Sequence, residues 1–388
     1  MLTDLSVQLR ERENAGLYRH RLLLEGPQTT QVTVAGKHYL AFCSNDYLGL
    51  ANHPALIEAA CQGARRYGVG SGASHLICGH SSAHHTLEEA LARFVDLPGA
   101  LLFSTGYMAN QAVVTALAGR ADAVFADKLN HASLNDAALL SRATFTRYPH
   151  LDLAKLARYL AESQAACKLV VTDAVFSMDG DIAPVAELLT LCEQYNAWLL
   201  LDDAHGFGVL GKNGKGVLHA FGGRKLHSPH LIYMATLGKA AGVFGAFVAA
   251  QPEVIATLIQ FARTYGYTTA TPPLLSHTVL ASLALIEQEA WRREKLTALM
   301  MQLRTGLESC RWPLLPSITP IQPLMVGGSE DAVRLSEGLR NKGILVPAIR
   351  PPTVPQDQAR LRISLSAAHS EEDIRRLVEA LHDLADIL

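Results

Sequence analysis

The sequence predicts an α/β protein, in which helices cover both faces of a mostly parallel sheet and a smaller α+β domain follows. Two observations support this fold class. Short apolar strands alternate with helical patterns from about residue 86 to residue 250, as in parallel sheets covered by helices. The last eighty or so residues instead run strand, helix, strand, proline-rich loop, strand and helix. We expect an N-terminal segment (1–50), a large domain (51–275) and a small C-terminal domain (276–388).

The composition supports a large folded core and excludes several classes of function. The chain has 388 residues, of which 49% are hydrophobic, and it carries 34 basic and 36 acidic side chains without a long run of one sign. This balance argues against nucleic-acid binding. No apolar run is long enough to span a membrane, and the charged N-terminus does not resemble a signal peptide. The six cysteines form no CxxC pair. We therefore expect a cytoplasmic protein with reduced thiols.

The first part of the chain predicts an amphipathic helix that ends near Gly16, and then a hairpin of strands 30–34 and 39–42. A helix capped near Asn52 has Pro54 in its first turn, and the glycine-rich residues 68–74 form a loop. Helices are expected at 86–96, 108–118, 133–140, 152–164 and 184–196. Strands are expected at 100–103, 123–126, 144–148, 169–172, 199–202, 231–235 and 246–250. The C-terminal part predicts helices at 276–309, 330–342 and 370–386 and a strand at 360–365.

Two of these strands end in residues that carry chemistry. The apolar strand 199–202 ends in Asp202, and His205 follows it closely, whereas strand 231–235 leads into Lys239 between small residues. Ligands of parallel sheets bind at the carboxyl ends of the strands, where both groups fall. A buried lysine with a depressed pKa suits Schiff-base chemistry, and a buried acid suits a protonated pyridine nitrogen. These residues predict a pyridoxal phosphate (PLP) site. Asp203 is expected to be structural.

Other residues at the same sheet edge allow more than one interpretation. Residues 104–110 follow a strand and open a helix, which suits a phosphate at the helix N-terminus, although many strand–helix turns look similar. His131 could stack on an aromatic ring or cap the following helix. His205 could line the ring or cap its turn, and we favour the ring. Ser177 and Asp179 follow another strand and are expected at the same rim.

Two patterns are rejected as sites. Residues 206–212 match GxGxxG and most of a P-loop, but Asn213 replaces the required Ser or Thr, and no ribose-binding acid follows at the expected distance. This run predicts a tight crossover loop. His80, His84 and His85 could place two ligands on one helix face, but there is no HExxH glutamate, so no metal site is expected.

Several motifs spread over nearly the whole chain resemble the α-oxoamine synthases, which are PLP enzymes of fold type I. These motifs are SNDYLGL (44–50), the glycine loop (68–74), STGYMAN (104–110), DKLNHASL (127–134), VFSMDGD (175–181), LDDAHGFGVLG (201–211), TLGKAAG (236–242) and IRPPTVP (349–355) with ARLRISLSAAH (359–369). DDAHG followed at this distance by TxGK is highly specific for the family. Ala73 and His75 depart from the glycine and, in many members, the arginine of the family's loop, and Phe244 stands where a smaller residue is common.

The resemblance implies a role for individual residues of this chain. Lys239 would hold PLP covalently, Asp202 would pair with the pyridine nitrogen, and His131 would stack on the ring. His205 and Ser177 would flank the phenolic oxygen of the cofactor. The phosphate and its surroundings would be served by Gly106, Tyr107, Thr236 and, from the partner subunit of a homodimer, Thr268 and Thr269. Arg350 would hold the amino-acid carboxylate, and the acyl substrate would meet Arg19, Asn45 and Thr353.

The segment 349–355 resembles the biotin-pathway branch of the family. That branch implies a decarboxylating condensation of L-alanine with a pimeloyl thioester, with coenzyme A or a carrier protein as the thiol. In this reaction Lys239 and His131 would assist proton movement. Three alternatives stay open: another α-oxoamine synthase, such as a glycine-using acetyltransferase, an aminotransferase of the same fold, and a non-enzymatic nucleotide-binding module that uses residues 206–211.

Overall fold

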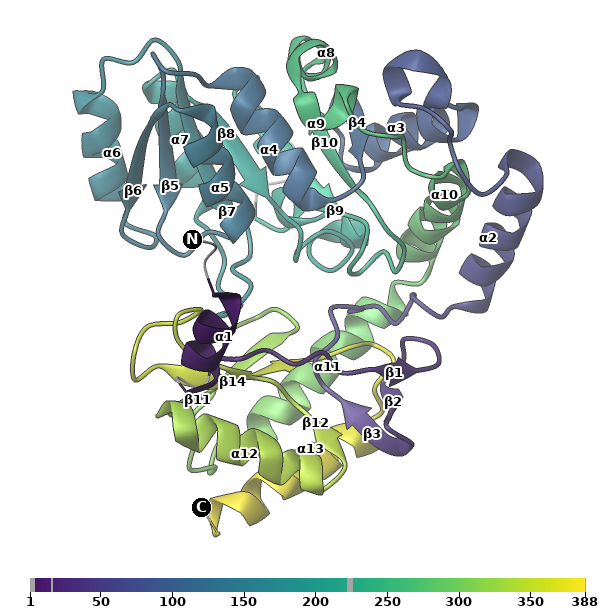
Figure 1. Ribbon diagram of the computed structural model, residues 1–388, viewed down its shortest axis with the longest axis vertical. Helices are drawn as coiled ribbons and strands as arrows, with labels where there is room; N and C mark the ends of the chain where they lie inside the picture. The colour runs from purple at the N-terminus through teal and green to yellow at the C-terminus, as the bar shows by residue number, and fades with distance from the viewer. Residues whose placement is uncertain (1–3, 15–16, 222–225, 388) are drawn as a thin grey trace.

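The computed structural model describes residues 4–14, 17–221 and 226–387. Figure 1 shows an upper body around a seven-stranded sheet and a lower body around two smaller sheets. The strands of the large sheet are β4 (Gly99–Phe103), β5 (Ala123–Asp127), β6 (Thr144–Tyr148), β7 (Lys168–Asp173), β8 (Trp198–Asp202), β9 (Leu231–Thr236) and β10 (Ala246–Ala250). Their bounds lie within one residue of the predicted ones.

The large sheet is parallel except at one edge. Its order is β4-β10-β9-β8-β7-β5-β6. The strands from β9 to β6 pair in parallel, whereas β10 runs antiparallel to both β4 and β9. The predicted fold class, with its mostly parallel sheet, is therefore confirmed.

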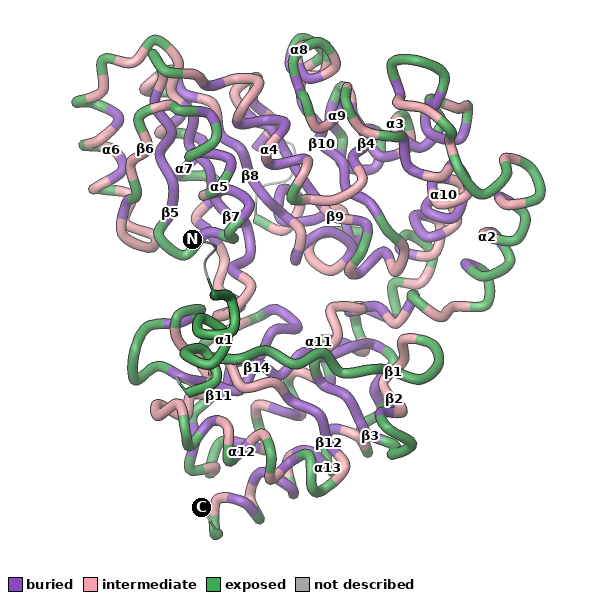
Figure 2. Tube along the Cα trace, in the orientation of Figure 1, coloured by how far each residue is buried: buried purple, intermediate pink, exposed green. Residues whose placement is uncertain are grey.

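Helices cover both faces of this sheet because successive strand residues point to opposite sides. In β8, Leu200 packs with one set of helices, and its neighbours Leu199 and Leu201 pack with the other. The first set comprises α4 (Gly106–Leu117), α5 (Ala132–Ser141), α8 (Pro252–Phe261) and α9 (Arg263–Gly266). The second comprises α3 (Ser82–Phe94), α6 (Leu153–Glu162), α7 (Val185–Gln194) and α10 (Pro273–Gln288). Figure 2 shows the resulting buried strands at the centre of the upper body.

The lower body joins the two ends of the chain. Its helices are α1 (Leu5–Asn14), α11 (Trp291–Gly306), α12 (Ser329–Asn341) and α13 (Glu371–Ala385). One sheet has the order β1 (Leu24–Glu25), β2 (Gln31–Val34), β3 (Lys37–Ala41), β12 (Ile344–Leu345), and the other has β11 (Ile321–Gly327), β14 (Ala359–Ser364), β13 (Ala348–Ile349). Because β3 pairs with β12, the predicted N-terminal and C-terminal parts share a sheet. The domain boundaries stay a prediction, and the one at residue 275 falls inside α10.

One helix prediction needs correction. The long helix expected at 276–309 is two helices, because Glu289 leaves the helical conformation. The guanidinium of Arg293 then donates to the carbonyl of Ile286, and that of Arg292 to the carbonyl of Leu48, which turns α11 towards the lower body. The helix that begins at Pro54, α2 (Pro54–Tyr67), follows the prediction: its cap is His53, next to Asn52, and His53 Nδ1 accepts the Ala55 N–H.

The remaining segments follow the prediction. Residues 68–74 form a loop, and a short π-helical turn (His75–Gly79) connects it to α3. The N-terminal helix α1 ends at Asn14, and its predicted end near Gly16 lies outside the described residues. Among the helices that the structure describes, none combines the length and apolar character needed to cross a membrane.

Candidate active site

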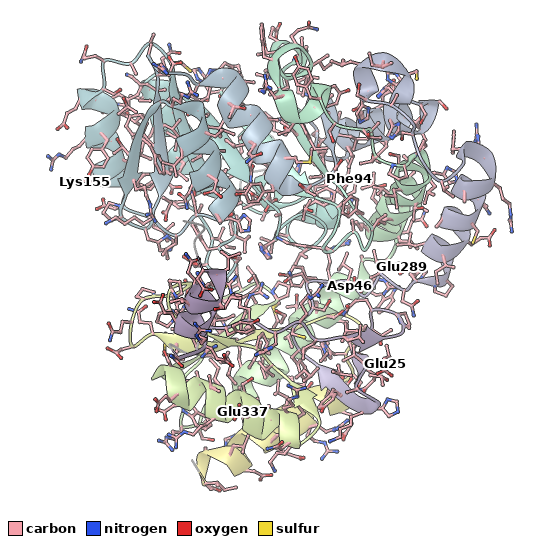
Figure 3. All side chains as sticks on the ribbon, viewed as in Figure 1. Glu25, Asp46, Phe94, Lys155, Glu289 and Glu337 are labelled. Carbon is pink, nitrogen blue, oxygen red and sulfur yellow. The ribbon has the colours of Figure 1, made fainter. Side chains whose placement is uncertain are left out.

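The carboxyl ends of β7, β8 and β9 bring the predicted residues together. Asp173 ends β7 and lies opposite Asp202, which ends β8, and Asp202 lies opposite Met234 in β9. This rim faces the lower body, where Asp46, next to Tyr47, lies on the side towards the upper body (Figure 3). Parallel strands thus place side chains from three separate stretches of sequence around one site.

Lys239 lies in the turn between β9 and β10 and begins a chain of polar contacts. This turn is closed by hydrogen bonds from the Leu237 N–H to the Gly245 carbonyl and from the Val243 N–H to the Leu237 carbonyl. The Lys239 amine lies 2.9 Å from His205 Nε2, and His205 Nδ1 lies 2.7 Å from the Tyr47 hydroxyl. Burial lowers the pKa of Lys239 to about 8, and burial beside the Lys239 cation lowers that of His205 well below its usual value. The lysine is thereby available as a neutral amine near neutral pH.

Asp202 is 4% exposed, and fixed donors hold both of its oxygens. Oδ2 accepts from the Asn110 side chain at 2.8 Å, and Oδ1 accepts the Ala204 N–H at 3.0 Å. Asp173 lies beside it, and burial together with the Asp202 charge raises the pKa of Asp173 well above its usual value. Two neighbouring buried carboxylates favour a cationic ligand.

His131 caps α5, which was one of its two predicted roles. Its ring nitrogen Nδ1 accepts the Ser133 backbone N–H, and its backbone N–H donates to Asp173 Oδ2 at 2.6 Å. The residue remains exposed, so the cap leaves part of the ring open. Burial lowers its pKa, although the nearby Asp202 charge opposes this shift. Stacking of His131 on a cofactor ring stays a prediction.

The residues predicted around a phosphate lie at several places. Helix α4 begins at Gly106 and is capped by the Thr105 hydroxyl, which accepts the Met108 N–H. The exposed Tyr107 donates its hydroxyl to Asp136, and the Thr236 hydroxyl donates to the Gly245 carbonyl at 3.0 Å. Thr268 and Thr269 follow α9 and precede Ala270, whose N–H donates to the Ala73 carbonyl. Their role at a partner's phosphate stays a prediction.

Arg362 belongs to this site although the sequence analysis did not single it out. It is 6% exposed, and its Nε donates to the Ser177 carbonyl at 2.5 Å. Its Nη2 makes longer bonds to Asn45 Oδ1, at 3.2 Å, and to the Tyr47 hydroxyl, at 3.4 Å. Its charge contributes to lowering the pKa of both Lys239 and His205. The sequence held a signal for this role: strand β14 is buried and carries two arginines, and buried charges require partners. The other arginine, Arg360, forms an ion pair with Asp179.

Arg350, Arg19 and Thr353 line a different cavity, of about 250 Å³. Arg12 contributes a third guanidinium to its lining. The structure therefore brings these three predicted substrate residues together, while Asn45 lies with Arg362 and Tyr47. A cavity with three arginines suits an anionic group.

The glycine run after Asp202 is a crossover loop, as the sequence predicts. Asp203 is fully buried and accepts hydrogen bonds from the Val217 N–H and the Tyr233 hydroxyl, which fits its expected structural role. A Cβ at Gly216 would come within 2.5 Å of both Asp203 Oδ2 and the Tyr233 hydroxyl, so only glycine fits this turn. Lys212 opens a three-residue 3₁₀ turn, whereas a P-loop lysine stands at the start of an α-helix.

Comparison with known proteins gives concordant matches. Residues 37–381 match the aminotransferase class I and II family. The 8-amino-7-oxononanoate synthase of Nitrosomonas europaea is 71% identical over 99% of this chain and 100% of its own. A structure described as SPT with PLP internal aldimine has a TM-score of 0.92 and 27% identity, covering 99% of this chain and 98% of the other. The 8-amino-7-oxononanoate synthase of Francisella tularensis has a TM-score of 0.77 and 32% identity, covering 90% and 98%.

Proposed function

Because the chain belongs to the aminotransferase class I and II family, we propose that it uses PLP to act as an 8-amino-7-oxononanoate synthase. This acyltransferase joins L-alanine to a pimeloyl thioester and releases 8-amino-7-oxononanoate, carbon dioxide and a free thiol, in biotin biosynthesis. The name of its full-length relatives agrees with the predicted resemblance to α-oxoamine synthases, and that prediction is confirmed. The observation that carries the proposal is the Lys239 amine with its depressed pKa, next to Asp202 and His205.

The residues at the sheet edge fit PLP. The carboxylate of Asp202 would hold a protonated pyridine nitrogen, and it is fixed for this by Asn110 and by the Ala204 N–H. The N-terminus of α4, capped by Thr105, would face the phosphate. When bound, PLP supplies a carbonyl carbon for Schiff-base formation and an electron sink for negative charge at the substrate Cα.

The protein's own groups bind the amino acid and move its proton. With its pKa lowered to about 8, Lys239 is neutral in roughly half of the molecules at pH 8 and therefore suits a base that removes the α-proton of alanine. Neutral His205 keeps the lysine amine in place through the 2.9 Å contact, and the Tyr47 hydroxyl orients the His205 ring from the other side. His131, with its open ring, would assist proton movement next to Lys239.

We assign the alanine carboxylate to Arg362 instead of Arg350. The guanidinium of Arg362 is oriented by Ser177, Asn45 and Tyr47, and its charge acts on Lys239. A carboxylate would replace the longer bonds from its Nη2 to Asn45 and Tyr47, and the guanidinium would then bind it with two hydrogen bonds. Arg350, together with Arg19 and Thr353, would bind the distal carboxylate of the pimeloyl chain in their shared cavity.

A cytoplasmic homodimer completes the proposal. Thr268 and Thr269 would reach the phosphate of the partner subunit, which fits their place on a partly exposed segment after α9. Analytical ultracentrifugation of the PLP-loaded protein would give a dimer mass. A monomer that is fully active would contradict the shared site.

The decisive experiment measures thiol release from pimeloyl-CoA and L-alanine, by the wild type and by Lys239→Ala. We expect release only by the wild type, and poor activity when glycine replaces alanine. Turnover of acetyl-CoA with glycine, but not of the pimeloyl pair, would keep the family and overturn the substrate. Keto-acid formation without thiol release would instead indicate an aminotransferase.

A further inference from the structure

A cluster of imidazoles and one carboxylate lies outside the Lys239 site and shares no residue with it. His75 and His80 flank the π-helical turn that leads to α3, and His85 and Glu88 lie one turn apart on α3. The ligand atoms of His80, His85 and Glu88 all lie within 4.8 Å of one another. Spacing of this kind is what a metal ion with three protein ligands needs.

His80 is oriented by a second histidine. Its Nδ1 lies 3.0 Å from His75 Nδ1, and the His75 ring stacks on Tyr265 with centroids 4.8 Å apart. This 3.0 Å contact allows His75 Nδ1 to accept the His80 Nδ1–H. The lone pair of His80 is then on Nε2. A histidine ligand that donates its other nitrogen to a fixed acceptor is the usual arrangement at metal sites.

Glu88 offers a free carboxylate oxygen to the same point. Its Oε1 accepts the Leu102 N–H of β4 at 3.0 Å, which fixes the side chain against the sheet. Its Oε2 lies 3.8 Å from His80 Nε2, too far for a hydrogen bond. The side chain is only 12% exposed. A carboxylate buried in this way is stabilised by a cation.

His84, whose ring stacks on that of His80 with centroids 5.7 Å apart, is not available as a ligand. Its Nδ1 accepts the Ser81 N–H at 3.0 Å and completes the capping box of α3. Its Nε2 donates to the Thr271 carbonyl at 2.7 Å. Both nitrogens are therefore used by the fold. His85, in contrast, is 66% exposed. Its Nε2 lies 3.5 Å from Glu89, and its ring stands edge-on to that of His80 with centroids 6.0 Å apart, so the ring can rotate towards Glu88.

We propose that His80 Nε2, His85 and Glu88 Oε2 bind a divalent transition-metal ion of the zinc class. Zinc bonds of about 2.0–2.1 Å in a tetrahedral site separate the ligand atoms by about 3.3 Å. Small shifts of His80 and Glu88 would shorten their 3.8 Å separation, rotation of the exposed His85 side chain would bring in the third ligand, and water would complete the coordination. Two imidazoles and one carboxylate match the ligand preference of Zn²⁺, Co²⁺ and Ni²⁺.

The ion would stabilise the region that anchors residues 268–271, the segment that reaches the partner subunit in the proposed dimer. It would tie the turn before α3 to strand β4 through Glu88 and Leu102. The same region holds residues 270–271, because Ser71 Oγ and His84 Nε2 both donate to the Thr271 carbonyl, and the Ala270 N–H donates to Ala73. Thr268 and Thr269 precede these anchors. This effect is structural, so the test measures binding and not activity.

The experiment titrates CoCl₂ and ZnCl₂ into the untagged, PLP-loaded protein after dialysis against a chelator. Calorimetry counts the ions bound per chain, and the visible bands of bound Co²⁺ report its coordination. We expect one ion per chain. Removing a residue that only hydrogen-bonds a metal ligand typically weakens metal binding by roughly 10- to 100-fold, and this is the loss expected for His75→Asn. His85→Asn and Glu88→Gln remove ligands themselves and should weaken binding by more than that. His38→Asn, on another exposed histidine, should bind like the wild type.

Three outcomes would overturn the proposal. The wild type could bind no ion above the level of weak nonspecific association. His85→Asn and Glu88→Gln could keep wild-type affinity. His75→Asn could abolish binding while His85→Asn leaves it unchanged, which would assign the ion to the neighbouring group of His75, His80 and His84. Circular dichroism of each variant would confirm that it is folded, since both substituted side chains lie on one helix that His84 caps independently.

Discussion

The depressed pKa of Lys239 makes a quantitative prediction about its reactivity. Burial lowers this pKa from 10.5 to about 8, while the Asp202 and Asp173 charges limit the shift. At pH 7 an amine with a pKa of about 8 is neutral in roughly 9% of molecules, against roughly 0.03% for a pKa of 10.5, a difference of roughly 300-fold. Because only the neutral amine attacks an aldehyde, cofactor-free protein should capture PLP on Lys239 at a rate that follows this fraction.

The assay mixes cofactor-free protein with PLP in a stopped-flow instrument and follows Schiff-base absorbance across the pH range, with Lys239→Ala as the blank. The capture rate should rise with pH and level off above pH 8. Replacing the carboxylate in Asp202→Asn removes a charge that raises the Lys239 pKa, so its midpoint should move to lower pH. Arg362→Gln removes a charge that lowers this pKa and should move the midpoint to higher pH. A wild-type midpoint near 10.5, or shifts of the opposite sign, would refute the reasoning.

Three further predictions follow from the site. Arg362→Lys should lower kcat/KM for L-alanine by roughly 10- to 100-fold, the loss of a charge-assisted hydrogen bond, whereas Arg350→Lys should chiefly raise the KM for the thioester; equal effects on both substrates would contradict the assignment. Tyr47→Phe leaves buried His205 Nδ1 without its hydroxyl partner and should cost about 1–3 kcal/mol in the free energy of unfolding, measured with urea. The folded-state pKa of Asp203 is raised from 3.8 to about 7, so the folded state binds more protons in that range and stability should fall as pH rises through it. Asp203→Asn should flatten this part of the stability curve, and an unchanged slope would exclude Asp203 as its cause.

The sequence predicted those parts of the fold that depend on local pattern. The large sheet was predictable because each of its strands is a short apolar run between helical patterns, and Lys239 and Asp202 stand at the ends of such runs. Strand ends meet at one edge of a parallel sheet wherever they lie in the sequence. The chemistry of Lys239 could therefore be inferred before its neighbours were known.

Contacts between distant segments could not be inferred in the same way. Arg362 lies about 120 residues after Lys239, and only folding of the lower body onto the rim places it beside Asn45 and Tyr47. Next to the break at Glu289, Arg292 donates to the carbonyl of Leu48, about 240 residues away in the sequence. The sequence offered no HExxH glutamate beside the histidines, whereas the turn before α3 brings His80 close to Glu88. In each case a tertiary contact outweighed the local pattern.

The pairing of β3 with β12 has a consequence for how the chain folds during its synthesis. About 300 residues separate Ala41 from Ile344, and ribosomes add roughly 5–20 residues per second, so the edge of β3 waits roughly 15–60 s for its partner strand. During that time the upper body can complete its sheet, because β4 to β10 are contiguous in the sequence. The hairpin of β2 and β3 meanwhile presents an unpaired strand edge, which is prone to aggregation. A chaperone that shields nascent chains should therefore raise the soluble yield of this protein.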